Sequence, residues 1–293
     1  MDLEKYSQYK ETLLHEQPGF AYNTYLCTIP QDFDRVDPHW HDQMEIIYVK
    51  KGSGVVTAGS RKYPVQAGSI MPILPGELHA IDGTPNVRME YENIIFSLKL
   101  LDNQVDNDWA ERYVLTPLRK GTLRFPRPIH TGTIFHDEVS AALDAADKAC
   151  DKKQDGYSLI VRSNLYLLLY SLYTHRNNRE NLSPSPYEDA IKQVLIYVKT
   201  HFAEPLTVRN VAKRIDYSDA HFMRIFKKEL GVTFVEYLTD YRLRYASYLL
   251  KEDTDTVSEI AAKCGFESAS YFTRCFKSKY GVSPKVYRQR KQD

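Results

Sequence analysis

The sequence predicts a mixed fold: an all-β barrel or jelly roll first, then a pair of helices, and finally an all-α domain with two helix-turn-helix motifs. Three observations lead to this prediction. Short apolar runs broken by glycine and proline fill residues 20–100. Helical periodicity replaces them over residues 134–175. From Thr207 to Arg290, one helix-turn-helix pattern occurs twice.

Length and composition set the frame for these elements. With 293 residues and 43% hydrophobic side chains, the chain can build a core in each of two domains. Residues 1–133 are expected to form the barrel, 134–175 the helical segment, 176–186 a polar linker with two prolines, and 187–293 the repeat domain. No run of eighteen apolar residues and no signal-peptide pattern occurs, so we expect a cytoplasmic protein without a membrane partner.

Four polar residues stand out in the predicted barrel: His39, His41, Glu45 and His79. The first three share parity, so on an undisturbed strand they face the same side. Three interpretations remain open. Three imidazoles and a carboxylate suit a divalent metal such as Zn, Ni, Fe or Mn. The same groups can instead contact a small effector without a metal, or satisfy one another by hydrogen bonds at the barrel mouth.

Two further residues are candidates for effector binding. Arg35 and Tyr91 lie on or beside predicted strands, where a guanidinium could clamp a ligand and a ring could stack on one. Which way they face does not follow from the sequence. None of these residues requires a cofactor. A divalent metal is the one cofactor that the cluster of His39, His41, Glu45 and His79 could bind.

The helical segment contains an amphipathic stretch over 135–150 and a leucine-rich stretch over 157–173. The second carries leucines over more than one face, so it needs two packing partners. One is the barrel. The other is expected to be the same helix pair of a second subunit, through Leu168 and Leu172, with internal three-layer packing as the alternative.

The repeat has clear helix boundaries. Thr207 and Thr256 are N-caps of the first helices, Ser218 and Ser268 cap the second helices, and Gly231 and Gly281 follow the second helices. Each second helix has an apolar stripe at i, i+3, i+4 spacing, namely Phe222, Ile225 and Phe226, then Phe272, Cys275 and Phe276. The opposite stripes are Ala220, Met223, Arg224 and Lys227, then Ala269, Ser270, Thr273, Arg274 and Lys277.

These outer stripes have the chemistry of a DNA reader. A small residue allows close approach to a groove, Arg can donate two hydrogen bonds to guanine, and Lys one turn later can reach a phosphate. The plain alternative is two amphipathic hairpins with solvated faces, which the duplication disfavours. Residues 234–251 form a continuous helical pattern about 27 Å long, close to the ~34 Å between successive major-groove faces.

Charge supports this assignment. The whole chain has a formal net charge of +1. From Pro186 onward there are 19 Lys and Arg against 14 Asp and Glu, whereas the preceding residues have 20 against 24. The repeat domain therefore has a net charge of +5 and the preceding residues a net charge of −4. Attraction for the phosphates of nucleic acid is expected on the repeat domain alone.

The second copy resembles the signature of AraC/XylS-type transcriptional regulators: Gly265-Phe266, then 270–277, then 280–288. The histidine and glutamate spacing in the barrel is similar to the two motifs of cupins. The resemblance implies a cupin-like sensor domain for a small molecule, most often a sugar, a homodimer, and base readers at Ala220, Met223, Arg224, Ser270, Thr273 and Arg274. Ala220 departs from the bulkier side chain that the family often has there.

Two functions from different classes follow. The leading hypothesis is a ligand-responsive, sequence-specific regulator that binds double-stranded promoter DNA and acts on the transcription machinery. It is not an enzyme on this hypothesis. The alternative is a metal-dependent cupin enzyme, of isomerase or dioxygenase type, with an accessory DNA module.

Overall fold

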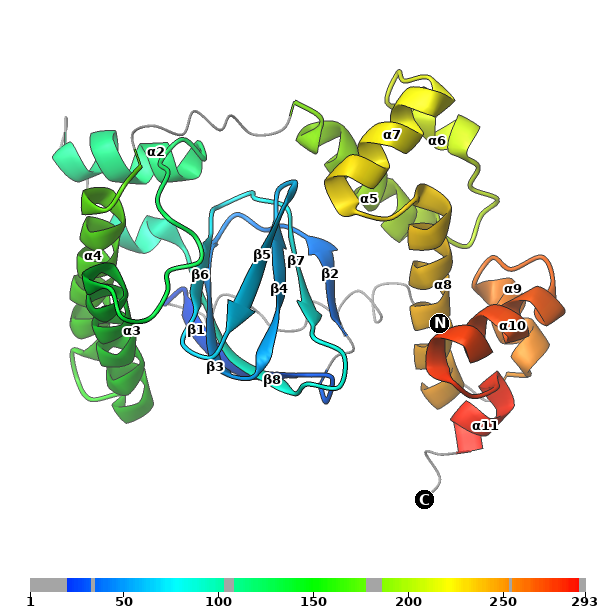
Figure 1. Cartoon of the computed structure of the whole chain (residues 1–293), viewed down its shortest axis with the longest axis horizontal. Coiled ribbons are helices and arrows are strands. Elements are labelled where there is room, and N and C mark those ends of the chain that lie inside the picture. Colours follow the sequence, from blue (N-terminus) through cyan, green and yellow to red (C-terminus); the bar gives the residue numbers. More distant parts are fainter. Residues whose placement is uncertain (1–19, 33–34, 103–107, 178–185, 253–254, 290–293) are drawn as a thin grey trace. The chain divides into compact units, whose positions relative to one another are not determined.

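The computed structural model describes residues 20–32, 35–102, 108–177, 186–252 and 255–289 (Figure 1). The described residues divide into two compact units, and the division falls between Pro186 and Tyr187. Most of the predicted linker over 176–186 lies outside the described residues. The mixed fold class is confirmed, with a β-sheet unit followed by a helical unit. None of the described helices is long and apolar enough to cross a membrane.

The first unit contains two antiparallel four-stranded sheets, which confirms the predicted all-β domain. The first sheet has the order β1-β8-β3-β6, with β1 Tyr22–Ile29, β8 Met89–Phe96, β3 Met44–Lys51 and β6 Ile70–Ile73. The second sheet has the order β2-β7-β4-β5, with β2 Arg35–His39, β7 His79–Gly83, β4 Ser53–Ala58 and β5 Arg61–Gln66.

The first sheet is buried on both faces. Along β3, Met44 and Ile46 belong to a core shared with helices, whereas Ile47 and Val49 belong to the core between the two sheets. Successive side chains of a strand point to opposite faces, so this alternation places the sheet in the middle of three layers. Glu45 has the parity of Ile47, and its side chain therefore points between the sheets.

The third layer is a pair of helices, α3 (Ile134–Lys152) and α4 (Tyr157–Thr174), which lie against this sheet (Figure 1). Helix α3 begins at Thr133, whose hydroxyl accepts a hydrogen bond from the His136 backbone N–H. Short helices precede the pair: η1 (Leu98–Leu101), η2 (Glu111–Leu115) and α2 (Thr116–Arg119).

The expected role of two leucines on α4 is wrong. Leu168 and Leu172 are both 0% exposed, because they fill the core between α3, α4 and the first sheet. Internal three-layer packing, the alternative interpretation, accounts for them. The exposed apolar side chains of α4 are others, namely Leu159, Ile160, Tyr166, Leu167 and Tyr170.

The regular elements in the described part of the second unit are all helices. They are α5 (Glu188–His201), α6 (Val208–Arg214), α7 (Asp219–Leu230), α8 (Phe234–Glu252), α9 (Val257–Lys263), α10 (Ala269–Tyr280) and α11 (Pro284–Gln289). Helices α6 and α7 are the first helix pair, and α9 and α10 are the second. The predicted caps are confirmed: the hydroxyls of Thr207, Ser218, Thr256 and Ser268 accept backbone N–H groups, and Gly231 and Gly281 end α7 and α10 at φ 75° and 74°.

Helix α8 joins the two helix pairs as one uninterrupted element of 19 residues. Its Phe234 ring lies 5.4 Å from Phe222 and 5.5 Å from Phe226, centroid to centroid, so the start of α8 shares the aromatic core of the first pair. Toward its middle, Tyr241 and Tyr245 contact the ring of Phe202 at the end of α5. These apolar contacts hold α8 against α7 of the first pair and against the end of α5.

Candidate functional site

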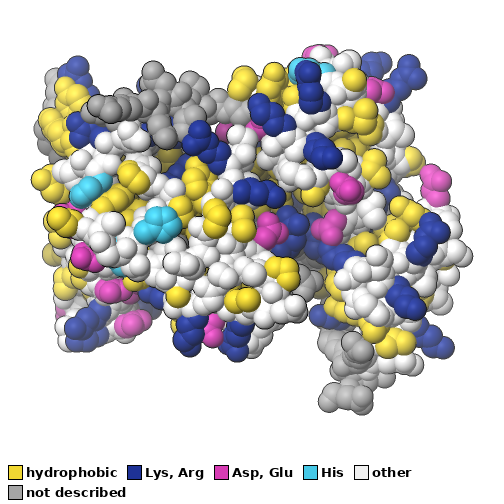
Figure 2. Space-filling view, in the orientation of Figure 1, with side chains coloured by type: hydrophobic (Ala, Val, Ile, Leu, Met, Phe, Trp, Pro, Cys, Tyr) yellow, Lys and Arg dark blue, Asp and Glu magenta, His cyan; other side chains and the backbone are white. Residues whose placement is uncertain are grey.

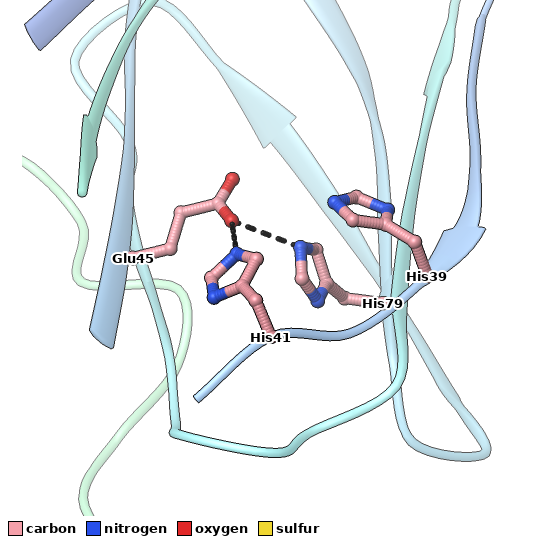
Figure 3. A group of neighbouring side chains, drawn as sticks. All are labelled: His39, His41, Glu45 and His79. Atoms are coloured by element: carbon pink, nitrogen blue, oxygen red, sulfur yellow. Dashed lines mark hydrogen bonds and ion pairs between the residues drawn. The ribbon is translucent and has the colours of Figure 1, made fainter. Parts of the chain in front are cut away.

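The structure brings the four polar residues of the barrel together at one end of the space between the sheets (Figure 3). Glu45 lies near the start of β3, His79 begins β7, His39 ends β2, and His41 lies in the connection from β2 to β3. One nitrogen or oxygen atom from each residue lies within 4.8 Å of those of the other three. Glu45 and His79 are each 1% exposed, whereas His39 and His41 are half-buried, so one side of the cluster is removed from water.

The carboxylate of Glu45 is the centre of the cluster. Its Oε2 lies 2.6 Å from Nε2 of His41 and 2.9 Å from Nε2 of His79. The ring of His39 lies beside that of His79, with 4.1 Å between centroids. A buried carboxylate is costly unless it is paired and hydrogen-bonded, and the two imidazoles supply both.

Backbone carbonyl groups determine which ring nitrogen faces the cluster. Nδ1 of His39 lies 2.8 Å from the Asp37 carbonyl, Nδ1 of His41 lies 3.1 Å from that of Gln43, and Nδ1 of His79 lies 2.9 Å from that of Glu77. A carbonyl oxygen only accepts hydrogen bonds, so each Nδ1 carries a proton and donates it. A neutral ring then has its lone pair on Nε2, which is the geometry of a metal-ligating histidine.

The pKa values follow from this geometry. Burial alone would raise the pKa of Glu45, but the attraction of His79 and the hydrogen bonds from both imidazoles outweigh it, and the pKa lies well below its ordinary value. Burial alone would lower the pKa of His79, but the neighbouring Glu45 carboxylate raises it above its ordinary value. Without a bound cation, the cluster therefore holds an ionised carboxylate against a protonated imidazole.

A second pair of charges supports His79. Arg127 donates from Nη1 to Glu77 Oε2 at 2.7 Å and from Nη2 to Glu77 Oε1 at 3.0 Å, in the bidentate arrangement that favours Arg. The backbone carbonyl of Glu77 is the acceptor for His79 Nδ1. Arg127 was not identified from the sequence, because it lies 50 residues from its partner in an irregular segment without a motif.

The other two effector candidates are not members of the cluster. Nε of Arg35 lies 3.4 Å from Asp82 Oδ1 and 3.6 Å from Asp37 Oδ1, so its charge is balanced by two carboxylates. Tyr91 is 1% exposed in the core between the sheets and pairs with Val49, four residues along β3 from Glu45. Burial raises the pKa of its phenol.

The residues predicted to read DNA lie on two helices of the second unit. On α7, Ala220, Met223, Arg224 and Lys227 are exposed, and on α10, Ser270, Arg274 and Lys277 are exposed, while Ala269 and Thr273 are half-buried. On the opposite stripes, Phe222, Phe226, Phe272 and Phe276 are each 0% exposed and Ile225 is buried, whereas Cys275 is half-buried. Figure 2 shows Lys and Arg side chains distributed over the visible surface of this unit.

Each exposed arginine contacts a ring one turn earlier in its helix. Nη2 of Arg224 lies 3.0 Å from Nδ1 of His221, and the guanidinium of Arg274 lies 5.4 Å from the centroid of the Tyr271 ring. The i, i+3 spacing that brings these pairs together was present in the sequence. His221 and Tyr271 were missed because only the outermost stripe was considered.

The pKa shifts predict how the stability of the metal-free protein depends on pH. The contribution of Glu45 is present above its unfolded pKa of about 4.3 and is lost as pH falls through its lower folded value. The contribution of His79 is fully present below about 6.5 and is lost as pH rises through its higher folded value. We therefore expect both contributions between about pH 4.3 and 6.5, and a decline above that window.

Thermal unfolding in the presence of a chelator, measured across this pH range, tests the pair. Glu45→Gln should flatten the decline above pH 6.5. The glutamine carries no charge, so deprotonation of His79 no longer breaks an ion pair. Asp42→Asn is the matched control, since Asp42 is exposed. A wild-type profile unchanged by Glu45→Gln would contradict the ionised pair.

Comparison with known proteins supports both units. Residues 23–169 match the AraC-like ligand binding domain family, and residues 211–290 match a helix-turn-helix domain family. The chain is 28% identical over 256 residues to the HTH-type transcriptional activator RhaR of Pectobacterium atrosepticum, covering 86% of both chains. It is 27% identical over 259 residues to the HTH-type transcriptional regulator YfiF of Bacillus subtilis, covering 87% of this chain and 79% of that protein.

Solved structures are also similar to part of the chain. The C-terminal domain of the response regulator yesN of Fusobacterium nucleatum is 30% identical, covering 34% of this chain and 98% of that chain, with a TM-score of 0.34. The matches to both domain families, together with an antiparallel barrel and two helix-turn-helix pairs, lead to one conclusion. The chain belongs to the AraC family of transcriptional regulators.

Proposed function

We propose that this protein is a ligand-responsive regulator that recognises a specific promoter sequence through α7 and α10 and binds a small molecule in its barrel. The observation that carries the proposal is the equivalent placement of Arg224 and Arg274, exposed on two helices whose other faces are buried. A monomer with one such helix would read a few base pairs. Two of them joined by α8 can read two segments of one duplex.

The dimensions support two adjacent contacts. Helix α8 has 19 residues and is about 28 Å long at 1.5 Å per residue. Major-groove faces on one side of B-DNA recur about every 34 Å. The remaining distance is within the reach of the side chains at each end.

The arginine and the lysine on one helix should contribute differently. Arg274→Ala should weaken binding to a selected site by roughly 1 to 3 kcal/mol and relax the preference at one base step, because a guanidinium can pair with guanine O6 and N7. Lys277→Ala should weaken all sequences about equally and reduce the salt dependence, because an ammonium contacts phosphate. Binding titrations against the selected site and single-base variants measure both effects. Unchanged affinity and preference in Arg274→Ala would show that α10 does not read bases.

The sensing site is the cluster of His39, His41, Glu45 and His79. Hydroxyl groups both donate and accept hydrogen bonds, so a polyhydroxylated ligand such as a sugar can satisfy imidazole and carboxylate groups together. Glu77 is less suited to acid–base chemistry, because Arg127 and the Leu74 N–H already occupy its carboxylate. That arrangement favours a sensor over a metal-dependent enzyme.

A divalent cation is the second candidate for the same cluster. Its support is the proton that each Nδ1 donates to a backbone carbonyl, because the three Nε2 atoms and the Glu45 carboxylate can then serve as ligands when a cation takes the place of the Nε2 protons. Three imidazoles with a carboxylate suit Zn, Ni, Fe or Mn. A cation bound there would replace protons that the imidazoles otherwise carry.

The two candidate ligands, a sugar and a divalent cation, are distinguished by which of them stabilises the protein. The true ligand, at a concentration about one hundred times its Kd, should raise the free energy of unfolding by about 2.7 kcal/mol. The ligands to be compared by calorimetry are a panel of sugars and, separately, Zn²⁺, Ni²⁺ and Mn²⁺ added to chelator-treated protein. Glu45→Ala and His79→Ala should abolish the response but leave ligand-free DNA binding intact, whereas His130→Ala, at an exposed histidine, should respond normally. A full response in both cluster variants would place the sensing site elsewhere.

The protein is also proposed to be a homodimer through the exposed face of α4. Leu159, Leu167 and Tyr170 are 69%, 58% and 62% exposed, and they recur at helical spacing. Large apolar side chains in such a row mark an interaction surface. A second copy of the same face completes a two-fold contact. The dimer would act in the cytoplasm, with promoter DNA and the transcription machinery as its partners.

Neighbouring leucines on α4 separate assembly from folding. Leu167→Glu should give a folded monomer, since its side chain is exposed. Leu168→Glu should unfold the first unit, because it places a charge in a closed core. Sedimentation velocity at tens of micromolar, with circular dichroism on the same samples, measures both. A wild-type monomer at that concentration, or a Leu167→Glu dimer, would contradict the proposed interface.

A further inference from the structure

The second helix pair touches the loop that follows α5, and α5 in turn contacts α7 of the first pair. Gly265, in the turn between α9 and α10, lies against the loop that follows α5. A Cβ atom at Gly265 would lie 2.8 Å from the Ala203 carbonyl oxygen and 2.9 Å from its carbonyl carbon and Cα. These are backbone atoms, so any side chain at this position would force the two segments apart.

Arg242 of α8 lies at the same junction. Its Nε donates to the Phe202 carbonyl at 2.7 Å, and its Nη2 donates to the Glu204 carbonyl at 2.7 Å. The other side of the junction is also near, since the guanidinium lies 6.0 Å from the centroid of the Phe266 ring. Arg242 therefore contacts the loop after α5 while lying beside the turn of the second pair.

The position of this loop makes those hydrogen bonds favourable. Phe202 is the C-cap of α5, where carbonyl groups lack partners within the helix and the helix dipole favours a positive charge. A guanidinium can donate two parallel hydrogen bonds from one rigid plane, which an ammonium cannot reproduce. Burial lowers the pKa of Arg242.

Each helix pair has its own attachment to α8. The first pair packs aromatic rings against Phe234, and the second pair places Lys279 of α10 against Asp240 of α8. The contact between Gly265 and Ala203 involves no residue of α8, so it joins the second pair to the loop after α5 in addition to these attachments.

We propose that this junction, made by Arg242 and Gly265 with the loop at 202–204, sets the relative orientation of α7 and α10. The spacing between the two base-reading segments then becomes part of the sequence specificity. Arg242 and Gly265 act as positioning residues and contact no base. The inference rests on the proposed reading of DNA by both helices.

The test measures tolerance to altered spacing. A duplex site is first selected from a random library with the full-length wild-type protein, and the segments that α7 and α10 protect are located by footprinting. One base pair is then inserted between them, which moves one segment by about 3.4 Å and turns it by about 35°. The wild type should lose about tenfold or more in affinity, as for a mismatched position. In Arg242→Met and Gly265→Ala, the loss on insertion should shrink to about threefold or less, while affinity for the original spacing falls.

Two matched variants separate positioning from charge and from backbone strain. Arg242→Lys keeps the positive charge but not the planar pair of donors, so it should also tolerate the insertion while its salt dependence stays at the wild-type value. Gly281→Ala introduces the same strain, at φ 74° against 78°, where nothing lies within 4 Å of the added Cβ. It should keep the wild-type penalty for insertion.

The outcomes distinguish whether the junction or α8 alone sets the spacing. An insertion penalty that stays at the wild-type value in Arg242→Met, Arg242→Lys and Gly265→Ala would overturn the proposal and leave α8 alone as the spacer. A wild type that tolerates the insertion would also overturn it. If the wild type selects no site, the proposed DNA reading itself fails, and that result is distinct from a failure of the junction. Circular dichroism identifies any variant that does not fold. If Arg242→Met is unfolded, the insertion penalty of the charge-conserving Arg242→Lys tests the proposal in its place.

Discussion

Burial of the first sheet on both faces is the constraint on which the first unit depends. Apolar residues alternate along β3 between a core shared with α3 and α4 and a core between the sheets. A sheet with two apolar faces needs cover on both sides. The second sheet supplies one cover and the helix pair the other, so the helices are part of the folded barrel unit.

The same alternation explains how a carboxylate enters the interior. Glu45 takes a place on the inward face of β3 that Ile47 and Val49 continue. Its burial is stable only with partners, and His41 and His79 approach from a connection and from the other sheet. The cluster thus joins both sheets at one end, and Arg127 extends it by holding Glu77 next to His79.

The segment after Arg127 leads back to the helices. Ile129 exchanges backbone hydrogen bonds with Ile70 of β6, and Nε2 of His136 in α3 donates to the Gly68 carbonyl at 2.9 Å. Contacts therefore run without a break from the cluster to the start of α3. A ligand can act on the helices only if it favours one arrangement of such contacts over another. In the second unit, Gly265 and Ala203 likewise bring together segments far apart in the sequence, and both residues lie outside α8.

The sequence by itself determined the elements whose signals are local. Capping hydroxyls, glycines after helices and stripes at i, i+3, i+4 spacing depend on neighbouring residues, so the two helix-turn-helix pairs and their exposed faces were predicted residue by residue. The strand pattern and the four cluster residues were also predicted. The parity expected on one undisturbed strand was wrong, because His39 ends β2, His41 lies in the connection and Glu45 lies in β3. Only the tertiary structure decided which apolar face of α4 is covered, since Leu167 and Leu168 differ in burial but not in chemistry. It likewise decided the partners of Arg127 and Arg242, because a salt bridge or a carbonyl contact between segments about 40 to 50 residues apart leaves no pattern in either segment.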